Sequence, residues 1–273
     1  MKLKFLAFIF LFTVSVDNNY AQTSIKMSSW NIANFGKSKS DSTLNFIANT
    51  LRYFDVVAIQ EVVAGYGGAQ AVAKLVDILN TKGENWDYSI SDPTSSDNKY
   101  KRERYAFLWK TSKLSKVGDA WLERKYSVEM DREPYFITLK SNKTLFTLST
   151  FHAITKAQQP ETELKYFKLI RAEYPSLNLI FCGDFNCPQS HTVFVPLKSM
   201  GFKPVLVGQK TSLRQKCLES GCLASEYDNA FYDTAKAKLI TSGIVNFYLN
   251  FLDMKSARKG SDHVPIYFEL QQF

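Results

Sequence analysis

The sequence predicts a single α/β domain in which mixed β-sheets carry helices on their outer faces. Strand and helix patterns alternate early in the chain, several strands then follow one another directly, and no Pro-, Gly- or Ser-rich linker divides the 273 residues. Strands that follow one another without a helix argue against a purely parallel sheet, so we expect mixed sheets. The hydrophobic content of 45% is ample for a large core.

The N-terminal part has the pattern of a β-α-β-α unit. Residues 25–32 alternate as in a half-buried strand, and residues 55–59 form a second, short β-rich run. Between them, apolar residues recur at helical spacing behind Asp41 or Ser42, either of which can cap a helix. Residues 67–80 repeat this helical spacing, so a second helix is expected there.

The middle and the C-terminal part combine further strands with two more helices. Strands are expected at residues 88–90, 105–109, 120–126, 135–139, 145–151, 177–182, 227–232, 238–247 and 264–270. Residues 140–143 are expected to turn a hairpin, and residues 161–174 to form a helix that ends at Pro175. A short helix over residues 193–200 is expected to end at Gly201.

The first segment is predicted to be a signal peptide. Lys2 and Lys4 form a charged start, and the apolar run 5–16 that follows is too short for a membrane span, which needs about 20 residues. Residues 1–22 are therefore expected to be removed, leaving a mature domain over residues 23–273. We expect this domain to be secreted or periplasmic, without membrane insertion, monomeric and without a stable protein partner.

The net charge is compatible with a polyanionic substrate. Loss of residues 1–22 removes two lysines and one aspartate, so the formal charge falls from +8 to +7. A basic exported protein suits nucleic acid, anionic lipid headgroups or acidic glycans, and simple solubility is the alternative explanation.

Four cysteines allow three full pairings, and export favours disulfides. Cys182 lies inside an apolar run and is expected to be a buried free thiol. A bridge is expected among Cys187, Cys217 and Cys222, and the sequence leaves its pairing open. A zinc site is disfavoured because paired C-x-x-C spacing is missing.

Polar residues repeatedly follow or precede the apolar strands of this chain. They are Asn31, Gln60, Glu61, His152, Asp184, Asn186, Asp228, Asn229, Asp262 and His263. Each one alone is more typical of a turn, a cap or a satisfied core residue, but their joint occurrence indicates a site. If the strand ends share one edge, these groups converge on one pocket.

The residue types in this set indicate one kind of chemistry. Carboxylate and amide oxygens are hard donors that suit magnesium, manganese or calcium rather than zinc or copper. Imidazoles held by carboxylates can act as general acids or stabilise a charged transition state. A divalent metal, a carboxylate that positions water and a histidine together favour phosphodiester hydrolysis.

The order and wording of the motifs resemble the endonuclease/exonuclease/phosphatase superfamily and, within it, the deoxyribonuclease I-like nucleases. Across residues 25–270 the motifs are Trp-Asn-Ile, Gln-Glu-Val, Arg-Tyr-Ala-Phe, Phe-His-Ala, Gly-Asp-Phe-Asn, Tyr-Asp-Asn and Ser-Asp-His-Val-Pro. The resemblance implies a four-layered α/β sandwich, with two mixed β-sheets packed face to face and helices outside. It also implies a Mg²⁺-dependent endonuclease acting on DNA, with Mn²⁺ or Ca²⁺ as alternative ions.

The resemblance further implies roles for individual residues. Asn31 and Glu61 correspond to the primary metal contacts, with Asp262 nearby. Asp184 corresponds to the group that orients or deprotonates the attacking water, and Asn186 to the group that holds the phosphate. The remaining implied residues are two histidine–carboxylate pairs, His152 with Glu103 and His263 with Asp228, and two arginines near the scissile phosphate or backbone, Arg104 and Arg132. Which histidine protonates the leaving oxygen is left open.

Several features depart from this pattern or receive no function. Val63 occupies the place of an arginine that, in the family, enters the minor groove of DNA. Binding in the minor groove is therefore expected to be weaker here or to depend on other residues. The glycine-rich residues 65–68 are expected to be a loop, His191 to be exposed, and the apolar segment 245–254 to be a core strand. The alternative function is a phosphodiesterase or phosphatase of the same fold that acts on a lipid headgroup or an inositol phosphate.

Overall fold

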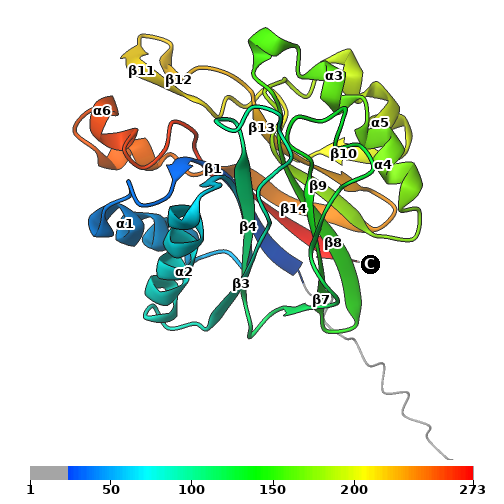
Figure 1. Ribbon diagram of the computed structural model, residues 1–273, viewed down its shortest axis with the longest axis horizontal. Helices are drawn as coiled ribbons and strands as arrows, with labels where there is room; N and C mark the ends of the chain where they lie inside the picture. The colour runs from blue at the N-terminus through cyan, green and yellow to red at the C-terminus, as the bar shows by residue number, and fades with distance from the viewer. Residues whose placement is uncertain (1–23, 273) are drawn as a thin grey trace, which may run out of the picture.

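Two mixed β-sheets lie face to face, and helices cover the outer face of each sheet (Figure 1). The computed structural model describes residues 24–272, so the predicted signal peptide lies outside the described residues. The four layers expected for this sequence are therefore present. Among residues 24–272, no helix has the length and apolar character needed to cross a membrane.

The first sheet has six strands, of which one neighbouring pair, β1 and β2, is parallel. In order across the sheet, the strands are β14 (Ala237–Ile244), β15 (Ile266–Gln272), β1 (Ser24–Phe35), β2 (Val56–Val63), β4 (Glu103–Lys110) and β3 (Trp86–Ile90). All other neighbouring pairs of this sheet are antiparallel, and two of them, β3 with β4 and β14 with β15, join strands that follow one another in the chain, so strands and helices do not alternate regularly after residue 80.

The second sheet has seven strands, and its parallel pair is β8 and β9. Its strands are β10 (Phe202–Pro204), β13 (Asp228–Asp233), β9 (Leu179–Asp184), β8 (Thr144–His152), β7 (Tyr135–Ser141) and β5 (Ser115–Lys116), with β6 (Trp121–Leu122) also on β7. The hairpin expected at residues 140–143 joins β7 to β8.

The helices divide between the two outer faces. Helices α1 (Asp41–Leu51) and α2 (Tyr66–Asn80) pack on the first sheet, and α3 (Glu161–Leu164), α4 (Phe167–Glu173) and α5 (Val195–Ser199) pack on the second. Helix α1 begins where Ser40, not Asp41 or Ser42, caps it by accepting the N–H of Thr43. Its buried side chains, Leu44, Ile47, Ala48 and Leu51, form the apolar stripe seen in the sequence.

Three apolar layers hold the sandwich together. The central layer fills the space between the sheets, with residues such as Phe107 and Phe268 facing Ile137 and Ile180. The two outer layers lie under the helices and are equally buried. At about 25 cal/mol per Å² of buried apolar surface, such layers supply most of the favourable free energy of folding.

Smaller elements lie outside these layers. Strands β11 (Leu213–Leu218) and β12 (Gly221–Leu223) form a separate two-stranded ribbon, and α6 (Met254–Ala257) lies next to β11. The 3-10 turns are Lys156–Gln158, Thr192–Phe194 and Phe247–Asn250. A disulfide joins Cys217 to Cys222, while Cys182 and Cys187 are free and buried within the described chain.

Three expected elements differ from the structure. The helix expected over residues 161–174 is two short helices, because the N–H of Tyr166 bonds three residues back to Glu163 and tightens the turn. The strand expected over residues 120–126 is limited to β6, since Met130 N–H bonds to the carbonyl of Tyr126 and the chain turns. Residues 66–68 form the first turn of α2, which confirms the helix expected from residue 67 and leaves only residue 65 of the expected loop 65–68 outside it.

Segment 245–254 is not the core strand that its apolar content suggested. It forms a 3-10 turn and a bend, in which Phe247 packs at 5.4 Å from the ring of Trp30. Leu249 is 71% exposed and Leu252 is fully exposed. Buried and exposed apolar residues therefore follow one another without the two-residue period of a strand.

Gly183 is predicted to be irreplaceable in β9. Its φ is 139°, and a Cβ atom there would lie 2.0 Å from the carbonyl oxygen of Phe151 on β8. We expect Gly183→Ala to lower the free energy of unfolding by about 3 kcal/mol or more, because backbone strain and overpacking combine. Urea denaturation measures this change.

Gly118→Ala is the matched control for Gly183→Ala. Gly118 also has positive φ (69°), but no described atom lies within 4 Å of its Cβ position. Its expected cost is about 1–2 kcal/mol, the conformational part alone. Equal losses in the two variants would show that the close approach to Phe151 does not matter.

Candidate active site

The space between the sheets is apolar at one end and polar at the other. Side chains alternate along each strand, so the inward-facing positions that hold Met27, Phe107 and Ile180 continue to inward-facing polar residues near the strand end. These polar residues are Asn31, Gln60, Glu103, His152, Asp184 and Asp228, and all are buried. The site is therefore a continuation of the core layer rather than a surface feature.

Strand direction explains why residues far apart in the sequence meet there. The pairing places the carboxyl ends of β1, β2, β8 and β9 at one end of the sandwich. Antiparallel partners bring the amino ends of β4, β13 and β15 to the same end. Asp228 pairs with Asp184 in register, and His152 pairs with Asp184 on the other side of β9. The convergence expected from the sequence is present.

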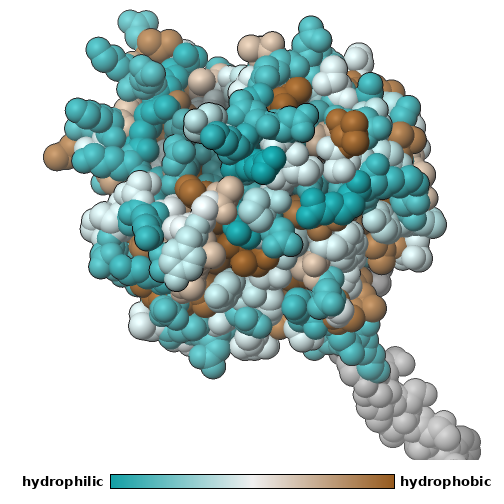
Figure 2. Space-filling view, in the orientation of Figure 1, coloured by the Kyte–Doolittle hydropathy of each residue, from teal (hydrophilic) through white to brown (hydrophobic). Residues whose placement is uncertain are grey.

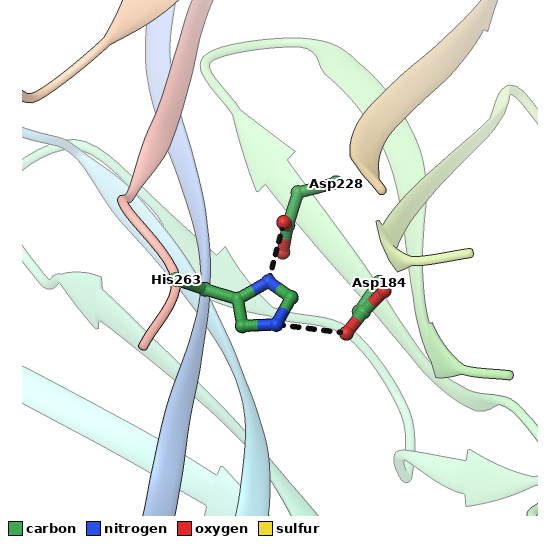
Figure 3. A group of neighbouring side chains, drawn as sticks. All are labelled: Asp184, Asp228 and His263. Atoms are coloured by element: carbon green, nitrogen blue, oxygen red, sulfur yellow. Dashed lines mark hydrogen bonds and ion pairs between the residues drawn. The ribbon is translucent and has the colours of Figure 1, made fainter. Parts of the chain in front are cut away.

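His263 lies between two carboxylates (Figure 3). Its Nδ1 is 2.7 Å from Oδ2 of Asp228, and its Nε2 is 3.6 Å from Oδ2 of Asp184. Burial lowers the pKa of His263, but the two carboxylates outweigh it and raise this pKa to about 10. The imidazole is therefore protonated at neutral pH.

His152 makes a second, similar arrangement. Its Nδ1 is 3.0 Å from Oε2 of Glu103, and its Nε2 is 3.5 Å from Oδ2 of Asp184. Burial and the charge of Arg132 lower the pKa of His152, yet Glu103 and Asp184 raise it more, so the net shift is upward. Arg132 in turn donates to Glu103 at 3.0 Å and to the carbonyl of Ala153 at 2.5 Å.

Asp184 is the centre of the polar cluster. Besides the two imidazoles, its Oδ2 accepts from Nδ2 of Asn31 at 3.0 Å, and its Oδ1 accepts from the N–H of Asn186 at 2.9 Å. Burial raises the pKa of Asp184, but His263 and His152 lower this pKa by more than burial raises it. The carboxyl group is therefore ionised although only 1% of the residue is exposed. It carries the negative charge that a group orienting water requires.

Glu61 reaches the cleft through a β-bulge. The pairing of β2 with β4 shifts register between Ile59 and Val62, and Glu61 has a φ of 60°. Gln60 can therefore face inward, where its Nε2 donates to Ser29 and Thr150, while Glu61 lines the cleft beside it. A regular strand would have pointed these neighbouring side chains to opposite faces.

The donor set fits a hard divalent cation. Oδ1 of Asn31 is buried, and within the described residues it has no hydrogen-bond partner. Glu61 and Asp262 line the cleft above it, with Oε2 of Glu61 held by the N–H of Asn34 at 2.9 Å and Oδ2 of Asp262 paired with Arg258 at 3.2 Å. An orphaned amide oxygen beside carboxylates suits Mg²⁺, Mn²⁺ or Ca²⁺. Lys39 lies close enough to influence both carboxylates and donates to the carbonyls of Lys259 and Gly260.

A second group of potential ligands is less suited to a metal. Ligand atoms of Asp184, Asp228 and His263 lie within 4.8 Å of one another. A metal ligand imidazole must be unprotonated, whereas the raised pKa of His263 keeps this ring charged. The three side chains are better suited to moving a proton.

Arg104 differs from its expected place. It lies on the outer face of β4, because Glu103 and Tyr105 take the inward positions on either side. Its guanidinium donates to the carbonyls of Ala64 and Ser91, so it ties two loops together instead of facing the phosphate site. Asn186 and Arg132, in contrast, line the cleft.

Sequence reasoning missed the residues that hold the site in place. Ser261 donates to the carbonyl of Asn31 at 2.5 Å and accepts the N–H of His263 at 3.1 Å. Thr211 donates to Oδ2 of Asp228 at 2.6 Å. Ser261 is the first residue of the Ser-Asp-His-Val-Pro motif, but its sequence context does not indicate a positioning role. Thr211 belongs to no recognisable motif. His191 is exposed, as expected.

The polar cluster opens into a cleft of about 570 Å³. On one side the basic run Lys99 to Arg102 lines it, with Tyr100 87% exposed. A basic run with one aromatic residue can contact a nucleic-acid backbone or form a solvated loop, and the place of this run in the cleft favours the first. A cleft with an acidic floor and a basic wall can bind a phosphate ester beside a cation.

Two proteins with sequences similar to this chain are named as deoxyribonucleases. The chain is 27% identical over 268 residues to a deoxyribonuclease of Thioalkalivibrio sp. (strain K90mix), covering 90% of this chain and 71% of the relative. It is 24% identical over 292 residues to deoxyribonuclease gamma of Mus musculus, covering 97% of this chain and 90% of the relative.

Solved structures share the fold at lower identity. An endonuclease/exonuclease/phosphatase family protein from Bacteroides thetaiotaomicron matches with a TM-score of 0.66, 18% identity and coverage of 92% of this chain and 98% of its own. A mannosyl-6-phosphatase from Bacteroides thetaiotaomicron VPI-5482 matches with a TM-score of 0.64, 17% identity and coverage of 90% and 99%.

The model of one family matches residues 28–263, which include both histidine–carboxylate pairs and all the candidate metal contacts. Enzymes of this family hydrolyse phosphoric ester bonds and generally depend on a divalent metal, and the acidic donors around the cleft agree with that chemistry. The chain belongs to the endonuclease/exonuclease/phosphatase family.

Proposed function

We propose that the protein is a divalent-metal-dependent endonuclease that hydrolyses phosphodiester bonds of DNA by attack of water. The observation that carries the proposal is the position of Asp184. Its Oδ2 lies 3.5 and 3.6 Å from two imidazole nitrogens and 3.0 Å from the amide of Asn31, whose own oxygen is buried and unpaired in the described chain. The Asp184 carboxylate thus lies between the imidazoles of His152 and His263, next to the Asn31 amide whose oxygen is a candidate metal ligand.

The residues of the cluster have complementary roles in this mechanism. Asp184 orients and deprotonates the attacking water, and Asn186 holds the phosphate next to it. The pKa values of His152 and His263 are both raised, which favours the charged imidazoles, so one can donate a proton to the leaving oxygen while the other stabilises the charge that develops on the phosphate. Glu103 and Asp228 keep these imidazoles oriented and charged. Arg132 supplies positive charge at the cleft.

Asn31, Glu61 and Asp262 would hold the metal. A divalent cation held there would supply Lewis-acid stabilisation of the charge that develops on the phosphate. The chain itself prepares this place through the bulge at Glu61 and the bond from Ser261 to the carbonyl of Asn31.

DNA is the proposed substrate for two reasons. The relatives named above are deoxyribonucleases, and the basic run Lys99 to Arg102 provides cationic groups along the cleft. The predicted signal peptide and the Cys217–Cys222 disulfide support action outside the cytoplasm. A lipid headgroup or an inositol phosphate is the second candidate, favoured by the exposed Leu249 and Leu252 and by the shared fold of a phosphatase.

Chelation is expected to abolish activity. With Mg²⁺, the protein is expected to nick supercoiled plasmid, because the proposed metal supplies the charge stabilisation of the transition state. Gel electrophoresis with and without EDTA measures this, with sphingomyelin and inositol phosphates as parallel substrates. Release of phosphate or phosphocholine without nicking would replace the nuclease proposal by the second candidate.

The two buried histidines are expected to be essential. His263→Ala and His152→Ala should each lower kcat on plasmid about 10²- to 10⁴-fold, the usual contribution of a positioned acid or base. Asp184→Asn should lose at least as much. His191→Ala is the matched control, because His191 is exposed and only caps a 3-10 turn. Full activity of His263→Ala, with the fold intact by circular dichroism, would contradict the assignment.

Glu61→Gln is expected to weaken the metal site specifically. Removing one carboxylate charge should raise the half-saturating Mg²⁺ concentration at least about tenfold. Calorimetric titration of Mn²⁺ gives the same comparison without turnover. Glu84→Gln, at a half-buried glutamate outside the cleft that accepts from Ser112, is the control and should leave metal affinity unchanged. Equal affinities in the two variants would exclude Glu61 as a ligand.

A further inference from the structure

The ribbon of β11 and β12 stands apart from both sheets of the sandwich. Figure 1 shows it beyond the end of the sheets at which the polar cluster lies, next to α6. From Arg214 to the tip, β11 has no buried side chain. A two-stranded hairpin without a core is marginally stable on its own, so its order has to come from its base and its cross-link.

The base of the ribbon is bonded directly to the catalytic segment. Ser212 forms a β-bridge with His263, and the N–H of Leu213 bonds to the carbonyl of Asp262 at 2.7 Å. Arg258 of the α6 C-cap donates to the carbonyl of Leu213 at 2.5 Å. These bonds fix the base of the ribbon relative to His263.

The Cys217–Cys222 disulfide closes the ribbon near its tip. The two cysteines lie on neighbouring strands, and Leu218 pairs with Gly221 beyond them. With the base bonded to the site and the tip cross-linked, the ribbon has few conformations left to lose on binding a ligand.

The exposed side chains of this region are mainly basic. Arg214 is partly exposed and Lys216 is exposed on β11, and Nε of Arg214 donates to the carbonyl of Leu223 across the ribbon. The basic residues of the ribbon and of α6 with its caps are Arg214, Lys216, Lys255 and Arg258, of which Arg258 is paired with Asp262 at 3.2 Å, against the acidic Glu219 and Asp253. Figure 2 shows predominantly hydrophilic side chains over this part of the surface.

We propose that the β11–β12 ribbon is a DNA-binding arm, which holds the phosphate backbone of duplex DNA on one side of the bond that is cut. This inference rests on the proposed nuclease function and adds an arm opposite the basic run Lys99 to Arg102. A two-stranded ribbon fits against duplex DNA, and Arg and Lys side chains bind its phosphates. Lys216 lies on β11 beyond the bridge between Ser212 and His263, so its ammonium group is available to a phosphate outside the cleft.

The test compares Arg214→Ala/Lys216→Ala with the wild-type protein on a long duplex. Loss of two phosphate contacts should raise KM, leave kcat within about twofold, and make the slope of log KM against log salt shallower by about 2. Lys113→Ala/Lys116→Ala is the matched control, because these exposed lysines follow β4 at its far end from the site. It should keep the wild-type KM and slope.

A second variant tests the ribbon without changing its charge. Cys217→Ser/Cys222→Ser should also raise KM for the long duplex, because the unlinked arm must be ordered on binding. On a dinucleotide, which is too short to reach the arm, the ratio of variant to wild-type kcat/KM should be far closer to one than on the duplex.

The outcomes separate this inference from the function on which it rests. A wild-type protein that cuts DNA, with equal KM and salt slope in the ribbon and control variants, would overturn the arm and leave the nuclease proposal standing. A wild-type protein that cuts no DNA would overturn both. Equal losses on the dinucleotide and the duplex would show that the ribbon only supports His263.

Discussion

Three buried carboxylates impose the main constraint on this structure. Asp184, Asp228 and Glu103 have 1%, 2% and 6% of their surface exposed, at the end of an otherwise apolar layer. An unpaired charge in such a place costs several kcal/mol, so each must find a cation. His263 and His152 lie between Asp184 and the other two carboxylates, and Arg132 neutralises Glu103 further. The interactions that keep the interior folded are the same ones that charge the imidazoles.

Local backbone geometry makes this arrangement possible. The bulge at Glu61 lets two neighbouring residues, Gln60 and Glu61, serve the interior and the cleft separately. Gly183 brings β9 so close to β8 that no side chain fits between them, which sets the position of Asp184 beside His152. Ser261 then ties β1 to the segment that carries His263. Small departures from regular strands thus position every proposed proton carrier.

The sandwich provides the chemistry, whereas the elements outside it decide which phosphate ester can approach. The basic run Lys99 to Arg102 lines one side of the cleft, and the disulfide-closed ribbon leaves the active site beside His263. The exposed Leu249 and Leu252 of segment 245–254 also lie outside the two sheets. Relatives with the same core that act on nucleic acid or on a sugar phosphate agree with this division. Loops and ribbons outside the sheets can differ between relatives without destabilising the core, because their residues contribute little to its packing.

The sequence by itself determined the strands and helices with a strong period, such as β1, α1 and β9, because a two- or 3.6-residue apolar pattern survives in the fold that buries it. It also predicted which polar residues converge at one end of the sandwich, since they follow or precede apolar strands inside recognisable motifs. Only the tertiary structure decided that Arg104 faces outward, that segment 245–254 is not a strand, and that Cys217 pairs with Cys222. These outcomes depend on which strand faces and which chain segments the fold brings together, and a local apolar pattern does not encode that choice even for cysteines five residues apart.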